Sequence, residues 1–268
     1  MKQNEHEKKG TLTVKKRMYI SILLSVLALV GVTAATVAWF SIADNTRVRT
    51  MSLDIMADVS LRMDLDAHST IDQYVKTLSF RQIGNRIQQE KGFSFLDTPL
   101  QPVTTSDQST FTFENGSVAD PRSGAYLEFT LHFMAAEDMI VHLTSANSGD
   151  GQQDGTAILS KNPELPQAMR IAFTEGDTIW IYDPGMGDTA SGSGKVKTFG
   201  LPSASAMKLT DTNTMFSLKK ETDKAIQVHI WMEGTDPACT DSLKSADYAI
   251  RLRFTGTTED NKPFSENS

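Results

Sequence analysis

The chain of 268 residues contains a single cysteine, Cys239. One cysteine cannot form an internal disulfide, which excludes the class of small secreted domains that depend on disulfides for stability. A chain of this length can bury a sizeable core without covalent cross-links. We therefore expect a domain stabilised by packing, in which Cys239 is buried as a small apolar residue rather than engaged in an intermolecular bridge.

Short motifs that carry common enzymatic chemistry are also lacking. The sequence has no His-Glu-x-x-His pair for zinc and no Gly-x-Ser-x-Gly nucleophile turn. Gly194 and Lys195 lack the flanking residues that a phosphate-binding loop requires. We therefore expect no cofactor and no enzymatic activity. Catalytic residues can also come together from distant positions, so an exported hydrolase stays open as an alternative.

Residues with the spacing of metal ligands are scarce as well. His132 and His142 would lie on the outward face of adjacent strands if residues 127–143 form a hairpin, and His229 lies on the polar phase of a later strand. Neutral imidazoles bind zinc, but three separate surface histidines are the simpler interpretation. Asp154 lies in the Gly-rich loop 145–155, which does not match the spacing of a calcium-binding loop. We expect no metal site.

Positive charge is in short supply beyond the first 38 residues. The chain has 26 Lys and Arg against 33 Asp and Glu, and residues 1–38 hold six and two of these, so the remainder carries a net charge of −11. An acidic domain of this kind is not expected to bind nucleic acid or anionic lipid electrostatically. It fits a solvated extracellular surface.

The chain has only one long apolar run, and it lies near the N-terminus. No charged residue occurs between residues 18 and 43, and about 20 apolar residues suffice to cross a bilayer. The basic segment 1–17 precedes the run, so the positive-inside rule places this segment in the cytoplasm and everything after residue 43 outside. We therefore expect an exported protein of the cell surface or the extracellular space.

Small residues at the outer end of the run favour a signal peptide over a retained anchor. A signal peptidase needs small residues at the third and first positions before its cut. Thr36 and Ala38 fit a cut before Trp39, and residues 33–35 fit a cut before Thr36. On this interpretation residues 18–38 are the apolar part of a signal peptide. An uncleaved transmembrane helix over the same run stays open.

Alternating apolar and polar residues dominate the chain from residue 51 onward. The alternation over 51–65 is too long for one average strand, so we expect two strands, or one bent strand with a bulge near Ala57. The same period-two pattern, typical of a half-buried strand, recurs in several later segments. These segments are 126–133, 139–143, 169–173, 179–182, 226–232 and 248–254.

Turn residues separate these segments, and hardly any stretch has helical periodicity. Short helices are expected within 71–90 and 162–169, and residues 145–155 and 184–195 read as polar surface loops. Around ten strands separated by such turns predict an all-β fold, an antiparallel β-sandwich or jelly roll. We place this domain at residues 51–256, with an N-terminal arm at 39–50 and a polar tail at 257–268.

The most distinctive local run covers residues 230–239, with the sequence IWMEGTDPAC. Trp231 falls on the outward phase of its strand, where a tryptophan is either covered by a loop or part of a contact surface. Both interpretations stay open, and we keep Trp231 as a candidate surface contact. Glu233 and Asp236 are expected to cap the turn that follows rather than to perform chemistry.

The N-terminal region resembles a known family of exported proteins. Residues 36–41 (TVAWFS), followed by Asp44, Asn45 and the alternating segment 51–65, resemble the start of the TasA/camelysin-type family of Gram-positive bacteria. Members of that family are substrates of the SipW-type signal peptidase, with a small-residue cleavage site, an aromatic residue and a short polar stretch. The resemblance is specific over roughly residues 18–65.

This resemblance implies a fold, a location and a mode of assembly. It implies a jelly roll that is secreted and polymerises into fibres of the cell surface or biofilm matrix, with further copies of itself or other surface proteins as partners. In strand addition, a freed N-terminal segment completes a sheet of the next subunit. Trp39, Phe40 and Ile42 are the residues of this chain suited to anchor such an arm.

Two classes of function therefore compete. The first is an exported structural protein that polymerises through its N-terminal arm. The second is a membrane-anchored extracellular module that binds a glycan or a peptide. In that case the uncleaved helix holds the protein in the membrane, and the two Gly-rich loops, 145–155 and 184–195, contact the ligand. Pilin-type assembly is disfavoured, because no prepilin cut with a Glu five residues into the apolar run follows Arg17.

Overall fold

The computed structural model describes residues 18, 20–26, 49–58, 60–145, 153–202, 209–243 and 245–264. The chain forms two compact units, Met1–Asp44 and Asn45–Ser268. In the first unit, residues 20–26 are helical. None of the helices within the described ranges combines the length and the apolar character needed to cross a membrane. The predicted cleavage and arm residues lie outside the described residues: Thr36, Ala38, Trp39, Phe40 and Ile42.

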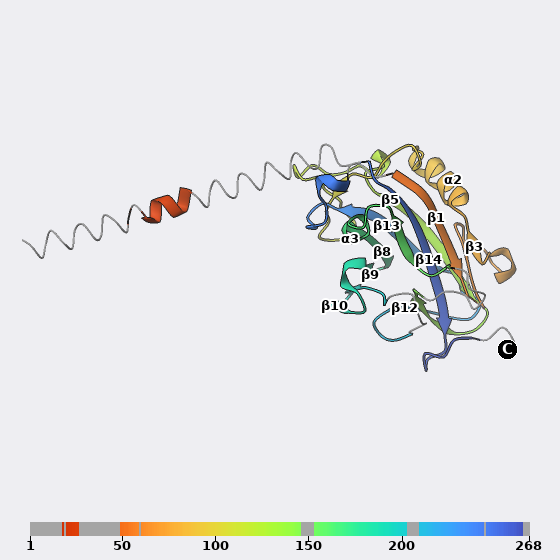
Figure 1. The fold of residues 1–268 in the computed structure, drawn as a ribbon. Helices are drawn as coiled ribbons and strands as arrows, with labels where there is room; N and C mark the ends of the chain where they lie inside the picture. Colours follow the sequence, from red (N-terminus) through yellow and green to blue (C-terminus); the bar gives the residue numbers. More distant parts are fainter. Residues whose placement is uncertain are drawn as a thin grey trace, which may run out of the picture. The chain divides into compact units, whose positions relative to one another are not determined.

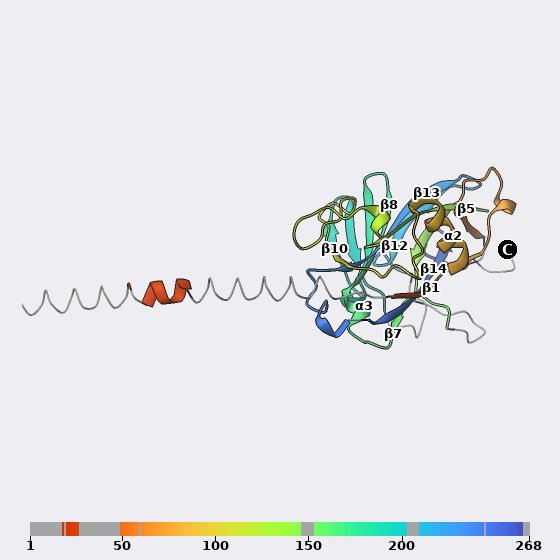
Figure 2. The same ribbon diagram turned by 90° about the horizontal axis from the view of Figure 1, so that it is seen from above.

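The second unit is built mostly from β-strands in two sheets (Figures 1 and 2). The first sheet has the order β12-β6-β14-β1-β3, with β7 also pairing β14. Its strands are β1 (Arg49–Ala57), β3 (Thr77–Leu78), β6 (Met139–Leu143), β7 (Ala157–Ser160), β12 (Thr214–Leu218) and β14 (Asp247–Thr257).

The second sheet has the order β10-β11-β9-β8-β13-β5-β2, with β4 also pairing β13. Its strands are β2 (Leu61–Asp64), β4 (Pro102–Val103), β5 (Leu127–Ala135), β8 (Met169–Glu175), β9 (Thr178–Tyr182), β10 (Ala190–Ser193), β11 (Val196–Phe199) and β13 (Lys224–Glu233). Apolar side chains from both sheets form one core. The predicted all-β sandwich is thus confirmed at this level.

The core follows the alternation of the sequence. On β13, Ile226, Val228, Ile230 and Met232 are fully buried, as expected when every second side chain of a strand faces the same way. On β14, the aromatic ring of Phe254 packs against Phe133 and Phe173 of the other sheet, with ring centroids 5.0 and 5.6 Å apart.

The predicted strand directions need a correction, because the sheets are mixed rather than antiparallel. β1 runs parallel to β14, β11 runs parallel to β9, and β4 runs parallel to β13. Parallel neighbours need a connection that crosses back over the sheet. Period-two alternation is the same in both orientations, so the pattern that identified the strands carries no information about their direction.

Two consecutive pairs of strands are divided between the sheets. The alternating segment 51–65 forms two strands, β1 in the first sheet and β2 in the second, with Ser60 in the left-handed region at φ 64° between them. The expected hairpin over residues 127–143 is wrong, because β5 belongs to the second sheet and β6 to the first. Strand β2 pairs with β5 instead.

Helices are short and lie at the margins of the sandwich. α2 (Phe80–Lys91) begins at Ser79, whose hydroxyl and amide both bond to Gln82, and ends at Gly92 in the left-handed conformation. The remaining helices are α3 (Leu165–Ala168) and the 3₁₀ turns η1 (Ile71–Gln73), η2 (Pro121–Ser123), η3 (Pro184–Met186) and η4 (Asp241–Leu243). The expected loop 184–195 therefore contains η3 and strand β10.

Candidate functional site

Trp231 is not a surface contact, which corrects one of the two interpretations left open above. Its side chain is 2% exposed, and it packs in a second small apolar cluster on the outer face of the second sheet. The ring of Phe111, from the loop that follows β4, lies 5.4 Å from its ring. The indole N–H donates to Glu233 at 2.9 Å. A loop more than a hundred residues earlier in the chain covers this tryptophan.

The run around Trp231 stabilises a turn. Glu233 accepts the amide of Thr235, and Asp236 accepts the amide of Ala238, so both carboxylates cap the turn as predicted. Arg170 of β8 forms ion pairs with Asp236 at 2.5 Å and with Asp183 at 3.1 Å.

Cys239 is buried, as expected. Burial raises the pKa of its thiol to about 12, so little thiolate forms near neutral pH.

The three candidate zinc histidines lie in separate environments. His132 contacts the carboxylate of Asp223 at 3.0 Å, and His229 lies 3.6 Å from Glu128. His142 is fully buried on β6 and forms hydrogen bonds with the hydroxyls of Thr257 and Thr214. Within the described ranges, no three His, Cys, Asp or Glu side chains are grouped as metal ligands.

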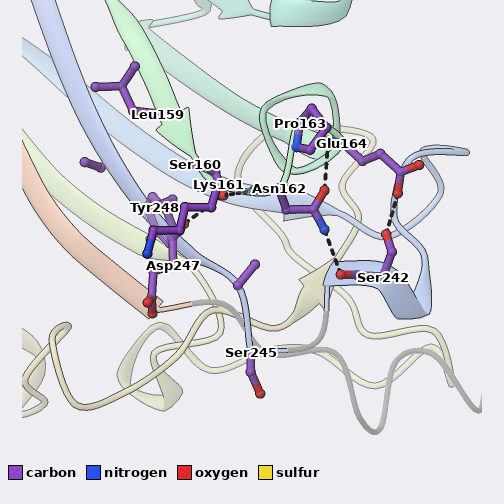
Figure 3. A pocket seen from close by; sticks show the side chains of 12 residues that line it. Leu159, Ser160, Lys161, Asn162, Pro163, Glu164, Ser242, Ser245, Asp247 and Tyr248 are labelled. Carbon is purple, nitrogen blue, oxygen red and sulfur yellow. Dashed lines mark hydrogen bonds between the residues drawn. The ribbon is translucent and has the colours of Figure 1, made fainter.

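A groove of about 920 Å³ lies on the outer face of the first sheet, where β14 begins beside β7 (Figure 3). We call it groove A. Its free polar side chains are Lys161, Ser245 and Asp247, and Leu159 of β7 is 47% exposed beside them. Among the described residues, neither Lys161 nor Asp247 has an ion-pair partner.

One wall of groove A is held by a closed set of hydrogen bonds, drawn as dashed lines in Figure 3. Asn162 donates its side-chain amide to the carbonyl of Ser242 at 2.7 Å and accepts the amide of Glu164 at 3.0 Å. The Ser242 hydroxyl in turn donates to the Glu164 carboxylate. These bonds fix the segment after β7 against η4, so the wall keeps its shape without a ligand.

A second hollow of about 640 Å³, groove B, lies on the same face. Its polar side chains come from β1, β3, β14, the start of α2 and the segment before β7: Asp54, Thr77, Ser79, Gln82, Gln153, Asp154 and Arg251. The Nε atom of Arg251 is buried and has no hydrogen-bond partner. Asp154 is already paired with Arg253 at 2.6 Å.

The two grooves adjoin along β14. Ala249 lines groove A and Arg251 lines groove B. Residues two apart on a strand share a face and lie roughly 7 Å from each other. The two grooves therefore border the same face of β14, groove A on the side of β7 and groove B on the side of β1.

The edge of β1 is a second candidate for interaction. On one side β1 pairs with β14 from Arg49 to Ala57. On the other side, β3 pairs only with Ile55 and Met56. Within the described ranges, residues 49–54 therefore have no strand partner on that side. Because β1 begins at Arg49, two residues earlier than the predicted domain boundary, this open edge overlaps the end of the predicted arm 39–50.

Two comparisons with known proteins find no match. No protein-family model matches the chain, and a search of curated proteins yields no match to its sequence. The groove residues Lys161, Asp247 and Arg251 belong to no motif, so the sequence alone does not mark them as a site. The sequence indicates only that Asp247 and Arg251 lie on the outward-facing side of the last strand.

Proposed function

We propose that this protein is an exported structural subunit of the cell surface or extracellular matrix, without enzymatic activity, that polymerises through its N-terminal arm. The proposal includes membership of the TasA/camelysin-type family and export by signal-peptide cleavage before Trp39. On this proposal the sandwich is a variant of the jelly roll in which the first and last strands pair in parallel.

The observation that carries the proposal is the open edge of β1. Within the described ranges, residues 49–54 have no strand partner on one side, and an extended segment can add to such an edge through main-chain hydrogen bonds. Because this edge overlaps the end of the arm, an arm that adds to β1 of the next subunit would continue a chain of subunits in one direction. Such a head-to-tail contact leads to a filament when it does not close into a ring.

The anchors of the arm are Trp39, Phe40 and Ile42. Aromatic and branched apolar side chains bury large areas and dominate interface energetics. Trp39 would be the first residue of the mature chain after the proposed cut.

The experiment compares chains that begin at Trp39 with chains that lack residues 39–43. The longer chain is expected to sediment as polymer and to form filaments in electron micrographs, whereas the shorter chain stays monomeric. A chain that keeps the arm but lacks residues 265–268 is the matched control and is expected to assemble. Equal polymer from all three chains would rule out the arm as donor.

The alternative is a binding module that stays anchored in the membrane, and the two adjoining grooves on β14 favour it. N-terminal sequencing of protein from native cells separates the two functions. A start at Trp39 supports the cleaved subunit, whereas an intact N-terminus supports the anchored module.

A further inference from the structure

We propose that grooves A and B together form a binding site for an oligosaccharide, a role beyond the proposed structural function. The site is the outer face of β14 between β7 and β1. Its central residues are Asp247 and Arg251, which line adjacent hollows of about 920 and 640 Å³. This role does not depend on whether the chain polymerises.

The backbone of β14 cannot recognise a peptide strand at this position. From Tyr248 to Arg251 the strand pairs with β7 on one side and with β1 on the other. Its main-chain hydrogen bonds are thus in use, and strand addition needs an unpaired edge. A ligand on this face must be held by side chains.

The side chains on the face suit hydroxyl groups. Hydroxyls both donate and accept hydrogen bonds, so they pair with ammonium and guanidinium donors as well as with carboxylate and amide acceptors. Lys161 and Arg251 supply donors, Asp247 supplies acceptors and Gln153 supplies both, while Gln82, whose carbonyl oxygen caps α2, supplies donors. The exposed Leu159 offers apolar contact for the carbon face of a sugar ring.

The charges of the face do not select an anion or a cation. Lys161 and Arg251 carry one positive charge each, and Asp54 and Asp247 carry one negative charge each. Asp154 is paired with Arg253, whereas Glu164 accepts a hydrogen bond from the neutral Ser242 hydroxyl and keeps its negative charge. Three negative charges thus face two positive ones, and a surface so close to balance favours a neutral, hydroxyl-rich chain over a polyanion or polycation.

The shape of the face also fits an extended ligand. The wall formed by Asn162, Glu164 and Ser242 is fixed by its own hydrogen bonds, and a preformed site loses less entropy on binding. The two hollows lie on the same face of β14, at Ala249 and at Arg251, and two neighbouring hollows suit a chain of sugar units better than a compact cofactor.

The test is calorimetric titration of the full chain, in a detergent without a sugar head group, with cellohexaose and with chitohexaose. At least one hexamer is expected to bind. Asp247→Asn and Arg251→Gln are each expected to weaken that binding about tenfold or more, because each removes a charge-assisted hydrogen bond. Lys195→Gln, in an exposed pair with Asp177 on the other sheet, is the matched control and is expected to bind as the unchanged chain does.

Thermal unfolding of each variant checks that a loss of binding is not a loss of folding. The proposal is overturned if neither hexamer binds at millimolar concentration. It is equally overturned if both groove variants bind as tightly as the unchanged chain. Binding of polylysine or polyglutamate without binding of either hexamer would contradict it too, because charge would then select the ligand.

Discussion

The hydroxyl of Thr50 donates a hydrogen bond of 2.6 Å to the phenol oxygen of Tyr248, and both side chains are buried. Thr50 lies near the start of β1 and Tyr248 near the start of β14, opposite each other in the parallel register. This bond therefore joins the first strand of the sandwich to the last one. It fixes the point at which the N-terminal segment enters the sheet.

Removing this bond should loosen the attachment of β1. Tyr248→Phe is expected to lower the free energy of unfolding by about 1 kcal/mol, because it deletes one buried hydrogen bond. Thr50→Val is expected to cost about 1 to 3 kcal/mol, since the Tyr248 hydroxyl would stay buried without its partner. Urea unfolding measures both. The double variant should cost less than the sum, and strict additivity would show that the two groups are not coupled.

Glu128 should make the domain sensitive to strong acid. A hydrogen bond from His229, together with Lys91, lowers the pKa of this carboxyl to about 2. The unfolded chain takes up the proton near pH 4.5, so the stabilisation is complete above that pH and is lost as the pH falls toward 2. We expect Glu128 to account for about 1 to 2 kcal/mol of the stability lost between pH 5 and pH 3.

The variant Glu128→Gln should lose correspondingly less stability across the same interval in urea unfolding. The exposed Glu137 provides the control, and Glu137→Gln should behave as the unchanged chain does. An identical acid response in all three proteins would contradict the role given to Glu128.

His142 should make the stability of the domain depend on pH in a higher pH interval than Glu128 does. Burial lowers the pKa of this imidazole to about 4 from an ordinary 6.5, so the folded protein keeps it neutral while the unfolded chain is already protonated. Stability is therefore expected to fall as the pH drops from 6.5 toward 4, by about 2 kcal/mol between pH 7 and pH 5. His142→Gln should flatten this dependence, and His68→Gln should leave it in place. A flat response of the unchanged chain would contradict the buried neutral form.

The buried face of each strand could be read from the sequence, and the partners of each strand could not. The alternation of Ile226, Val228, Ile230 and Met232 predicts their burial directly, because it follows from strand geometry. Trp231 lies on the outward-facing phase of the same strand, where an exposed residue would also lie. Its burial depends on Phe111, and no local periodicity reports a loop so distant along the chain.

The separation of His132 from His142 has a similar cause. The segments around them look like two strands of a hairpin, yet the chain crosses from the second sheet to the first between them. The sequence does not indicate the grooves on β14 either, because strand pairing creates them. Lys161 and Asp247 come from opposite ends of the β7–β14 connection, and only the pairing of these strands brings them to one surface.

The proposed polymer requires the arm of one subunit to add to the open edge of β1 in another. Two variants, Ile42→Cys and Ser52→Cys, test it directly when they are mixed under mild oxidation. Cys239 is buried and its pKa is raised, so the introduced thiols are the reactive ones. A disulfide requires the two Cα atoms to approach within about 7 Å.

Addition of the arm to β1 predicts a mixed disulfide between the Ile42→Cys and Ser52→Cys chains that outweighs the homodimers of either variant. No such product is expected when Ser52→Cys is replaced by Ser191→Cys, on the edge strand β10 of the other sheet. Chains that assemble without the mixed disulfide, or that link equally to Ser191→Cys, would rule out addition of the arm to β1.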